Sequence, residues 1–363
     1  MSEVQQIDRD KLGLFVKQTG GMVAAGFNCA ISLVGDRLGL FKELAANGPY
    51  DSEGLAGALG LQERWVREWL HHQACIGQVE YDAATATFAM SPEAAAVLAQ
   101  PEHPAFLMGA YESAVAVFPA VEKLADAFRT GLGMSYDDHG PNCACGIEQM
   151  GAFTKQQRLV PELIPMIPGM RERLQAGAKV ADVGCGGALS TIAMAQAFPN
   201  STFIGYDTST VALDRARANV AEAGLANIAL LNPMDEPLSA QGQFDLVTTF
   251  DVVHDTPYPD RLIADIFASL SAADGYWLCE DIKGFESFSE NHSQHPLAAL
   301  LYGFSVTICM SSGLSTPDGA GLGTLGFTRN MAESMGLAAG FTGFQHLEVD
   351  NPMNNYYLFS KTE

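Results

Sequence analysis

The sequence predicts an α/β fold in which a mostly parallel β-sheet, with an antiparallel last strand, follows an α-helical domain. Short apolar runs alternate with helix-length segments over the second half of the chain, and the first of these runs ends in a glycine-rich turn. Residues 12–46 have the broad apolar face of a buried helix. With 363 residues, the chain is long enough for two domains and a connector.

Composition limits the classes of partner. The chain has 42 acidic and 20 basic residues, a formal charge of −22, which opposes binding to nucleic acid and to anionic membranes. No apolar run approaches the roughly 20 residues of a membrane span, and the polar start MSEVQQIDRDK does not resemble a targeting signal. Seven cysteines in such a chain indicate reduced thiols, so we expect a cytoplasmic protein.

Residues 1–103 are predicted to form a helical winged-helix domain. After the helix of residues 12–46 come a short helix from Ser52, a longer one from Gln62, and the strands Gln78–Tyr81 and Thr87–Met90. A DNA-reading role is disfavoured, because residues 50–100 hold two arginines against seven carboxylates. A packing role is expected instead, and the broad apolar face of residues 12–46 favours a homodimer contact.

Residues 104–174 are predicted to be a helical connector, interrupted by a loop over residues 131–146 that is rich in turn formers. Loops beside a ligand-binding domain often close over substrate. Tyr136, His139 and a helix starting near Gln149 are therefore candidates for lining a pocket, although an ordinary surface loop fits the pattern equally well.

The third predicted domain, residues 175–363, opens with a strand, Lys179–Val183, a turn with three glycines, a helix from Ala188 to Phe198 and a second strand, Thr202–Tyr206. Glycines at such a turn let the backbone approach a ligand closely. Asp207 follows the second strand, at the distance where a carboxylate accepts the hydroxyls of an adenosine ribose. The segment therefore predicts an adenosine-containing ligand.

Two details distinguish between adenosine ligands. Leu189 stands where the dinucleotide fingerprint G-x-G-x-x-G requires its third glycine, which disfavours NAD. The charge of Asp182 would repel a pyrophosphate but would suit an ammonium group, which S-adenosylmethionine (SAM) carries. The spacing of Asp182, Gly184 and Gly186 resembles the D-x-G-x-G-x-G motif of class I SAM-dependent methyltransferases, with Ala188 as the last residue. The resemblance implies their Rossmann-like sheet and SAM as cofactor.

The predicted cofactor contacts lie at the carboxyl ends of several strands, where doubly wound sheets bind ligands. Residues 232–235, after the strand Ile228–Leu231, occupy the place where this family commonly contacts adenine. The next predicted strand, Phe244–Val253, ends in the cluster FDVVHD. The full set of predicted contacts is Asp182, Gly184, Cys185, Gly186, Asp207, Thr208, Pro233, Met234, Phe250 and Asp251.

The predicted catalytic group is His254. The pair His254-Asp255 resembles the H-D pair of winged-helix O-methyltransferases, whose histidine is the general base. In that group an acidic residue at the end of the next strand orients the imidazole. Here the strand Tyr276–Cys279 leads to Glu280, which we select for that role, with Asp281 as the alternative if the alignment slips by one. A histidine that merely caps the following helix is the competing structural interpretation.

Residues 284–325 form a long insertion that is expected to shape the acceptor pocket, and they resemble a bacterial subgroup of these enzymes. His292 and His295 could join His254 in a metal site, as in the related iron-containing keto-acid C-methyltransferases, but a site without metal is favoured. The chain then ends with a helix, Thr328–Leu337, and strands Gln345–Val349 and Tyr356–Ser360, which resemble the reversed hairpin of class I methyltransferases.

Taken together, these patterns predict a homodimeric methyltransferase that acts on a small molecule, with a hydroxyl oxygen as the favoured acceptor. Two other acceptors stay open: a thioether or thiol sulfur, and a keto-acid carbon with metal assistance. A SAM-sensing regulator that binds DNA through its winged helix is the alternative outside the enzymes.

Overall fold

The computed structural model describes residues 7–241, 243–271 and 274–362. Residues 1–6, which belong to the polar start of the chain, lie outside this range. The chain divides into two compact units: the first runs to Phe118 and includes Cys145–Met150, and the second holds Pro119–Ala144 and everything from Gly151 onward. Within the described ranges, none of the helices is both long and apolar enough to cross a membrane.

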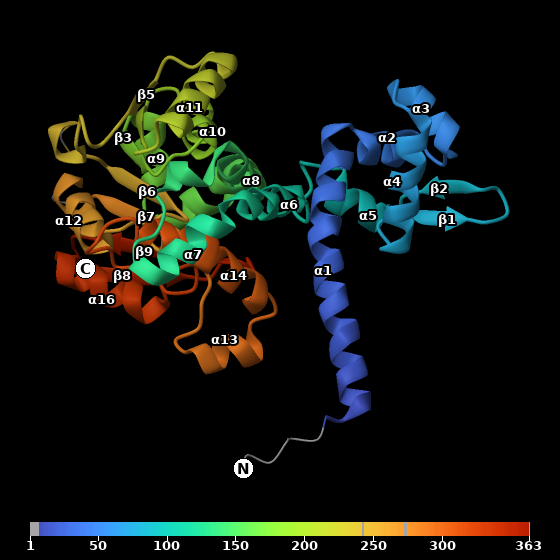
Figure 1. The fold of residues 1–363 in the computed structure, drawn as a ribbon. Coiled ribbons are helices and arrows are strands. Elements are labelled where there is room, and N and C mark those ends of the chain that lie inside the picture. Colours follow the sequence, from blue (N-terminus) through green and yellow to red (C-terminus); the bar gives the residue numbers. More distant parts are fainter. Residues whose placement is uncertain (1–6, 242, 272–273, 363) are drawn as a thin grey trace, which may run out of the picture. The chain divides into compact units, whose positions relative to one another are not determined.

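The first unit has the predicted winged-helix order (Figure 1). The antiparallel strands β1 and β2 form the wing, and the core gathers around Leu40, Phe41, Leu55 and Leu70. Its elements are α1 (Arg9–Arg37), α2 (Leu40–Asn47), α3 (Ser52–Leu59), α4 (Glu63–Cys75), β1 (Glu80–Asp82), β2 (Thr87–Ala89), α5 (Pro92–Leu98) and α6 (Met108–Val117).

The single helix predicted for residues 12–46 is in fact two helices. Gly39 separates α1 from α2 with a left-handed backbone, φ 72°, which glycine adopts without steric cost. The C-terminal part of α1 packs on α4, where the indole nitrogen of Trp69 donates a hydrogen bond to the carbonyl oxygen of Ile31. Gly35 is required at this crossing, since a Cβ there would lie 2.4 Å from the Trp69 ring.

The N-terminal half of α1 extends past α2–α5 (Figure 1). The sequence predicts a buried apolar face for this helix, but Leu14, Phe15, Met22, Val23 and Phe27 are each at least 60% exposed. The described residues of the same chain therefore leave this apolar face of α1 exposed.

The second unit is a sheet with helices on both faces (Figure 1). Its helical segments up to the sheet are η1 (Phe118–Ala120), α7 (Val121–Thr130), η2 (Tyr136–His139), α8 (Pro141–Phe153, shared with the first unit), η3 (Thr154–Leu163), η4 (Ile164–Met166) and α9 (Met170–Ala176). There follow β3 (Lys179–Val183), α10 (Leu189–Ala197), β4 (Thr202–Tyr206), α11 (Thr210–Ala223), β5 (Ile228–Leu231), η5 (Leu238–Gln241), β6 (Leu246–Phe250), α12 (Pro259–Ser269), β7 (Tyr276–Ile282), α13 (Phe288–Gln294), α14 (Ala298–Phe304), η6 (Ser305–Cys309), α15 (Met310–Gly313), α16 (Arg329–Ala339), β8 (Gly343–Leu347) and β9 (Asn354–Ser360).

The strand order is β5-β4-β3-β6-β7-β9-β8, and all neighbours are parallel except β9, which runs antiparallel to β7 and β8. One face packs on η3, η4, α9 and α10, and the other packs on α12 and α16. The predicted α/β fold with a reversed last hairpin is therefore confirmed. Because the order reverses between β3 and β6, the carboxyl ends of these two strands flank the crevice where ligands bind in such sheets.

Two predicted segments differ from the structure in their extent or content. The strand expected over Phe244–Val253 stops at Phe250, because Asp251 has a left-handed backbone with φ 59°. The insertion of residues 284–325 is largely helical and forms α13, α14, η6 and α15 before a glycine-containing loop. Its end returns to the sheet edge, where Ala320 N donates to the carbonyl oxygen of Pro257.

Candidate active site

The glycine turn leads from β3 into α10 at the carboxyl edge of the sheet. Gly184 and Gly186 have left-handed backbones, with φ 71° and 54°. A Cβ at Gly184 would lie 2.4 Å from a methyl group of Val252, so only glycine lets this turn pack against the end of β6. Ala188 also has a positive φ, 63°, which explains why glycine usually fills this motif position. Cys185, between the glycines, is buried.

Asp207 joins the end of β4 to the glycine turn. Its two carboxylate oxygens accept hydrogen bonds from the backbone nitrogens of Gly186 and Ser209, both at 2.8 Å. Burial raises the pKa of this carboxyl, while the two backbone donors lower it in part. Thr208 follows in the same turn, and Met234, predicted to contact adenine beside Pro233, has an 80% exposed side chain. These positions remain predicted cofactor contacts.

Asp182 has partners that sequence analysis did not identify. Its carboxylate accepts hydrogen bonds from the hydroxyls of Ser190 and Thr191, both at 2.6 Å, and of Thr248 at 3.0 Å. Burial raises its pKa and the three hydroxyls lower it. In this structure Asp182 therefore ties β3 to β6 and to the start of α10. A buried carboxylate followed by S-T eight residues later is the signal that could have indicated this role.

His254 and Asp281 form a buried pair beyond the ends of β6 and β7. The distance between His254 Nδ1 and Asp281 Oδ1 is 2.6 Å, and both side chains are at most 4% exposed. Asp281 Oδ1 also accepts a hydrogen bond from Ile282 N, which fixes the carboxylate. The ring nitrogen turned away from Asp281 is Nε2, so this atom is the one that can receive a proton from a substrate.

The carboxylate that contacts His254 is Asp281 rather than Glu280, and the reason is the alternation of side chains along a strand. Asp281 shares its side of β7 with Trp277 and Cys279, which pack toward α12 and α16. Glu280 shares the opposite side with Leu278, which packs toward η3 and α10. The choice of Glu280 as the orienting residue is thus corrected by one position.

The charge state of His254 reflects its neighbours. Burial alone would lower its pKa, but the Asp281 carboxylate and the Cys309 thiol more than offset burial and hold the pKa well above the usual range. Asp255 is the other member of the predicted catalytic pair, and desolvation raises its pKa to about 7. In the described structure no hydrogen bond joins the Asp255 side chain to His254, whose charge lowers the pKa of Asp255 in part.

Asp251, which is half-buried, and the buried Glu280 form a second group of acids at this edge. Asn354 Nδ2 donates to Asp251 Oδ1 at 2.6 Å, and Glu280 Oε2 is buried with no hydrogen-bond partner in the described structure. Burial raises the pKa of Asp251 to about 6, and burial followed by the nearby Asp251 raises that of Glu280 to about 8. The Lys155 ammonium lies 5.9 Å from the ring centroid of Phe250. The edge thus concentrates several carboxyl groups, and the charge of Lys155 lowers the pKa of both Asp251 and Glu280.

The segment predicted as a loop over residues 131–146 contains η2 and the start of α8, so the helix expected near Gln149 begins at Pro141. It is held against the insertion: Met134 N donates to Ser311 Oγ at 2.9 Å, and His139 Nε2 lies 3.3 Å from Ser312 Oγ. Burial raises the pKa of Tyr136 well above its usual range, and the charges of Asp255 and Asp207 act in the same direction.

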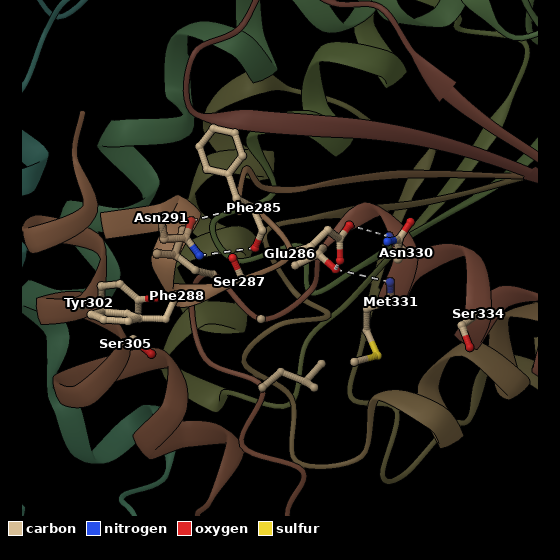
Figure 2. Close-up of a pocket in the computed structure, with 14 residues that line it drawn as sticks. Phe285, Glu286, Ser287, Phe288, Asn291, Tyr302, Ser305, Asn330, Met331 and Ser334 are labelled. Atoms are coloured by element: carbon tan, nitrogen blue, oxygen red, sulfur yellow. Dashed lines mark hydrogen bonds between the residues drawn. The ribbon is translucent and has the colours of Figure 1, made fainter. Parts of the chain in front are cut away.

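A cavity of about 490 Å³ lies elsewhere in this unit, between the insertion and the start of α16 (Figure 2). Glu286 in its wall accepts hydrogen bonds from Thr328 Oγ1 and Asn330 N, and the rings of Phe288 and Tyr302 have centroids 5.8 Å apart. None of the predicted site residues lines this cavity. Since the titratable groups gather at the sheet edge, we place the chemistry there.

The two histidines of the insertion are not arranged around His254. His295 Nε2 lies 3.0 Å from the carbonyl oxygen of Lys283, and His295 Nδ1 accepts a hydrogen bond from Leu297 N. The ring of His292 packs on Phe288 instead. Over the described residues, no three histidine, cysteine or acidic side chains are grouped so as to hold a metal ion.

Comparisons with known proteins fit this geometry. Residues 25–100 match the family model of the Rv2258c-like winged HTH domain, and residues 181–276 match that of a methyltransferase domain. The chain thus combines a segment that matches a winged HTH domain with a later segment that matches a methyltransferase domain.

Relatives of known sequence match only part of this chain. A ubiquinone biosynthesis O-methyltransferase from Thiobacillus denitrificans is 37% identical over 90 residues, which are 24% of this chain and 38% of the relative. The chain thus matches well under half of the length of that relative.

Solved structures share the fold over nearly the whole chain. The mitomycin 7-O-methyltransferase MmcR has a TM-score of 0.67 at 17% identity, over 97% of this chain and 99% of its own. Human N-acetylserotonin methyltransferase, solved in complex with SAM, has a TM-score of 0.65 at 15% identity, over 99% of both chains. At these identities the likeness establishes the fold, including the placement of a winged-helix domain before the sheet.

Proposed function

We propose that this protein transfers the methyl group of SAM to a hydroxyl oxygen of a small molecule, with His254 as general base. The observation that carries the proposal is the buried contact of 2.6 Å between His254 Nδ1 and Asp281 Oδ1 at the edge of the cofactor crevice. A histidine oriented in this way presents Nε2 to a substrate and can hold the proton it receives.

The residues at this edge fit a cationic cofactor. Two buried carboxylate oxygens, Glu280 Oε2 and Asp281 Oδ2, have no hydrogen-bond partner in the described structure, and the pKa of Asp255 is raised to about 7 by burial. When bound, SAM supplies a methyl group on a positively charged sulfur, and its charge would favour the ionised form of these acids. Asp207 would accept the ribose hydroxyls, and the backbone of Gly184–Gly186 would lie against the cofactor.

This chain's part in methyl transfer is alignment and removal of one proton. Hydrogen bonds to Ser311 and Ser312 hold the 131–146 segment, which includes Tyr136, against the insertion. We propose that these two segments together hold the acceptor hydroxyl near His254 Nε2. During methyl transfer His254 Nε2 would accept the proton of the acceptor hydroxyl, and Asp281 would stabilise the resulting imidazolium. A positioned base of this kind contributes about 10² to 10⁴ in rate.

The first unit supports a role in dimer formation rather than in DNA reading. Both arginines of α4 are engaged in ion pairs on their own helix, Arg64 with Glu68 and Arg67 with Glu63. These arginines are therefore poorly placed to contact phosphate. The exposed apolar face of α1 would instead be covered by a second copy of the chain.

The proposal is tested by incubating the full-length protein with SAM and a panel of small phenols, alcohols, thiols and thioethers, and measuring S-adenosylhomocysteine. Release with hydroxyl compounds that rises with pH supports an oxygen acceptor and a base. Release only with thioethers, at a rate independent of pH, contradicts the role of His254 because a thioether has no proton to lose. Calorimetry that shows binding of NAD but not of SAM would overturn the methyltransferase function itself.

A further inference from the structure

Lys155 is a cation at the edge of the cofactor crevice that neither the motif nor the histidine pair involves. It lies in the first turn of η3, a stretch of π-helix that continues from α8. Its ammonium is 5.9 Å from the ring centroid of Phe250, and it makes no hydrogen bond or ion pair among the described residues. Gly151 leaves room for it, since a Cβ there would come within 3.0 Å of Lys155 Nζ.

The surroundings place this ammonium beside the glycine turn. Phe250 is the last residue of β6, and Val252 packs on Gly184 at the start of the turn. η3 itself packs on α10, the helix that the turn begins. The charge of Lys155 acts on Asp182 and Cys185 of β3 and its turn, and on Asp251 and Glu280, lowering the pKa of each.

One of the carboxyls on which the charge of Lys155 acts, that of Asp251, is fixed in place. Asp251 is held by Asn354 Nδ2 at 2.6 Å and by its own backbone, whose nitrogen donates to the carbonyl oxygen of Glu280. Its left-handed backbone, φ 59°, is costly for a non-glycine residue and is typical of functional sites. An ammonium without an ion pair among the described residues and a fixed carboxyl at one sheet edge are complementary to a free amino acid, which carries one charge of each sign.

We propose that Lys155 binds the carboxylate of the cofactor's methionine end, while Asp251 binds its α-ammonium, so that this edge recognises the amino-acid zwitterion. The inference rests on the proposed use of SAM, and it adds a contact that lies outside the βα motif. Sequence spacing cannot reveal this contact, because Lys155 precedes β3 and reaches the site only through the packing of η3.

The test compares SAM with decarboxylated SAM, two ligands that differ only in the carboxylate of the methionine end. Isothermal calorimetry measures the affinity of each for the wild-type protein, Lys155→Met and Lys155→Arg, with Arg158→Met as the control. Arg158 lies on the same π-helix but contacts Glu162 and the Asp350 carbonyl oxygen. Circular dichroism shows whether each variant is folded.

We expect the wild type to bind SAM about 10- to 100-fold more tightly than decarboxylated SAM, the ratio that one charge-assisted hydrogen bond provides. Lys155→Met should remove this preference while it leaves the affinity for decarboxylated SAM nearly unchanged. Lys155→Arg should keep most of the preference, and Arg158→Met all of it.

An unchanged ratio in Lys155→Met, or an equal loss of both ligands, would show that Lys155 is only a counter-ion for Asp251 and Glu280, and would overturn the inference while SAM binding stands. A wild type that binds neither ligand would instead contradict the proposed function on which the inference rests. If Lys155→Met does not fold, the test rests on Lys155→Arg and on the wild-type ratio of the affinities for SAM and decarboxylated SAM. A wild-type ratio near one is by itself enough to reject the contact.

Discussion

His254 Nδ1 and Asp281 Oδ1 lie 2.6 Å apart in a region from which solvent is excluded. A carboxylate in this position keeps the imidazole in one orientation and stabilises its protonated form. The opposite ring nitrogen, Nε2, is the one that does not contact Asp281. The predictions on catalysis follow from this contact.

Asp281→Asn should lower turnover about 10²-fold or more, because the amide can neither stabilise the imidazolium nor set the ring tautomer. Glu280→Gln is the matched control, since Glu280 is the neighbouring acid on the other face of β7. At saturating SAM, Glu280→Gln should keep turnover within a few-fold of wild type. The measurement is the steady-state formation of S-adenosylhomocysteine, and a larger loss in Glu280→Gln than in Asp281→Asn would restore Glu280 as the orienting residue.

The ligand-free protein should lose thermal stability as pH rises from about 6 to about 9. Burial raises the pKa values of Asp251, Asp255 and Glu280 to about 6, 7 and 8, and the pKa of His254 is also raised, by Asp281. Each of these groups holds its proton more tightly in the folded state than in the unfolded state. Their contribution to stability is therefore complete below the unfolded pKa and is lost as pH passes through the folded pKa.

Differential scanning fluorimetry across this range measures the effect. Asp255→Asn should make the melting temperature less dependent on pH, because the amide does not titrate. Saturating SAM should flatten the curve as well, since a bound cation favours the ionised acids. A melting temperature that rises steadily toward pH 9 would contradict the assignment of these groups.

Asp207→Asn should weaken binding of SAM about 10- to 100-fold, because a charged acceptor for the ribose hydroxyls becomes a neutral amide. The substitution also changes the partner of Gly186 N, so part of the loss would come from the glycine turn. Calorimetry with adenosine separates these contributions, since adenosine keeps the ribose and lacks the methionine end. An Asp207→Asn protein that binds SAM as tightly as wild type would place the ribose elsewhere.

Substituting Phe15 and Phe27 of α1 together with aspartate should convert a dimer into a monomer, because their side chains, 66% and 67% exposed, lie on the face that we expect a second copy to cover. Trp65→Ser is the control, as Trp65 is 80% exposed but lies on α4. Light scattering at micromolar concentration gives the mass. A wild-type monomer, or a dimer that survives the double substitution, would exclude α1 as the contact.

The fold could be predicted from the sequence because its signals are local. Lys179–Val183 and Thr202–Tyr206 form strands with the predicted bounds, since their apolar runs end at a glycine turn and at Asp207. The break at Gly39 was missed because apolar spacing continues through it in both helices. The sequence pattern of α1 likewise predicts that its face is buried but cannot tell whether the cover comes from the same chain or from another.

The site could be predicted only as far as its strand ends. The cluster FDVVHD points to His254. The choice between Glu280 and Asp281 depends on which face of β7 each residue occupies, and the sequence of one strand fits either assignment of faces. The sequence around a site residue does not indicate contacts with side chains from distant segments. Thr248 bonds to Asp182 across two strands, and Lys155 reaches Phe250 from a helix that precedes the sheet.

The central claim is that His254 removes a proton from the acceptor, and the pH dependence of methyl transfer by wild type and His254→Ala tests it most directly. With an active hydroxyl acceptor and saturating SAM, the wild-type rate should rise with pH through the pKa of His254. His254→Ala should be slower by about 10² to 10⁴ and lack that rise, with SAM affinity nearly unchanged. A variant with full activity, together with a wild-type rate that does not vary with pH, would contradict the account and make His254 a wall of the pocket.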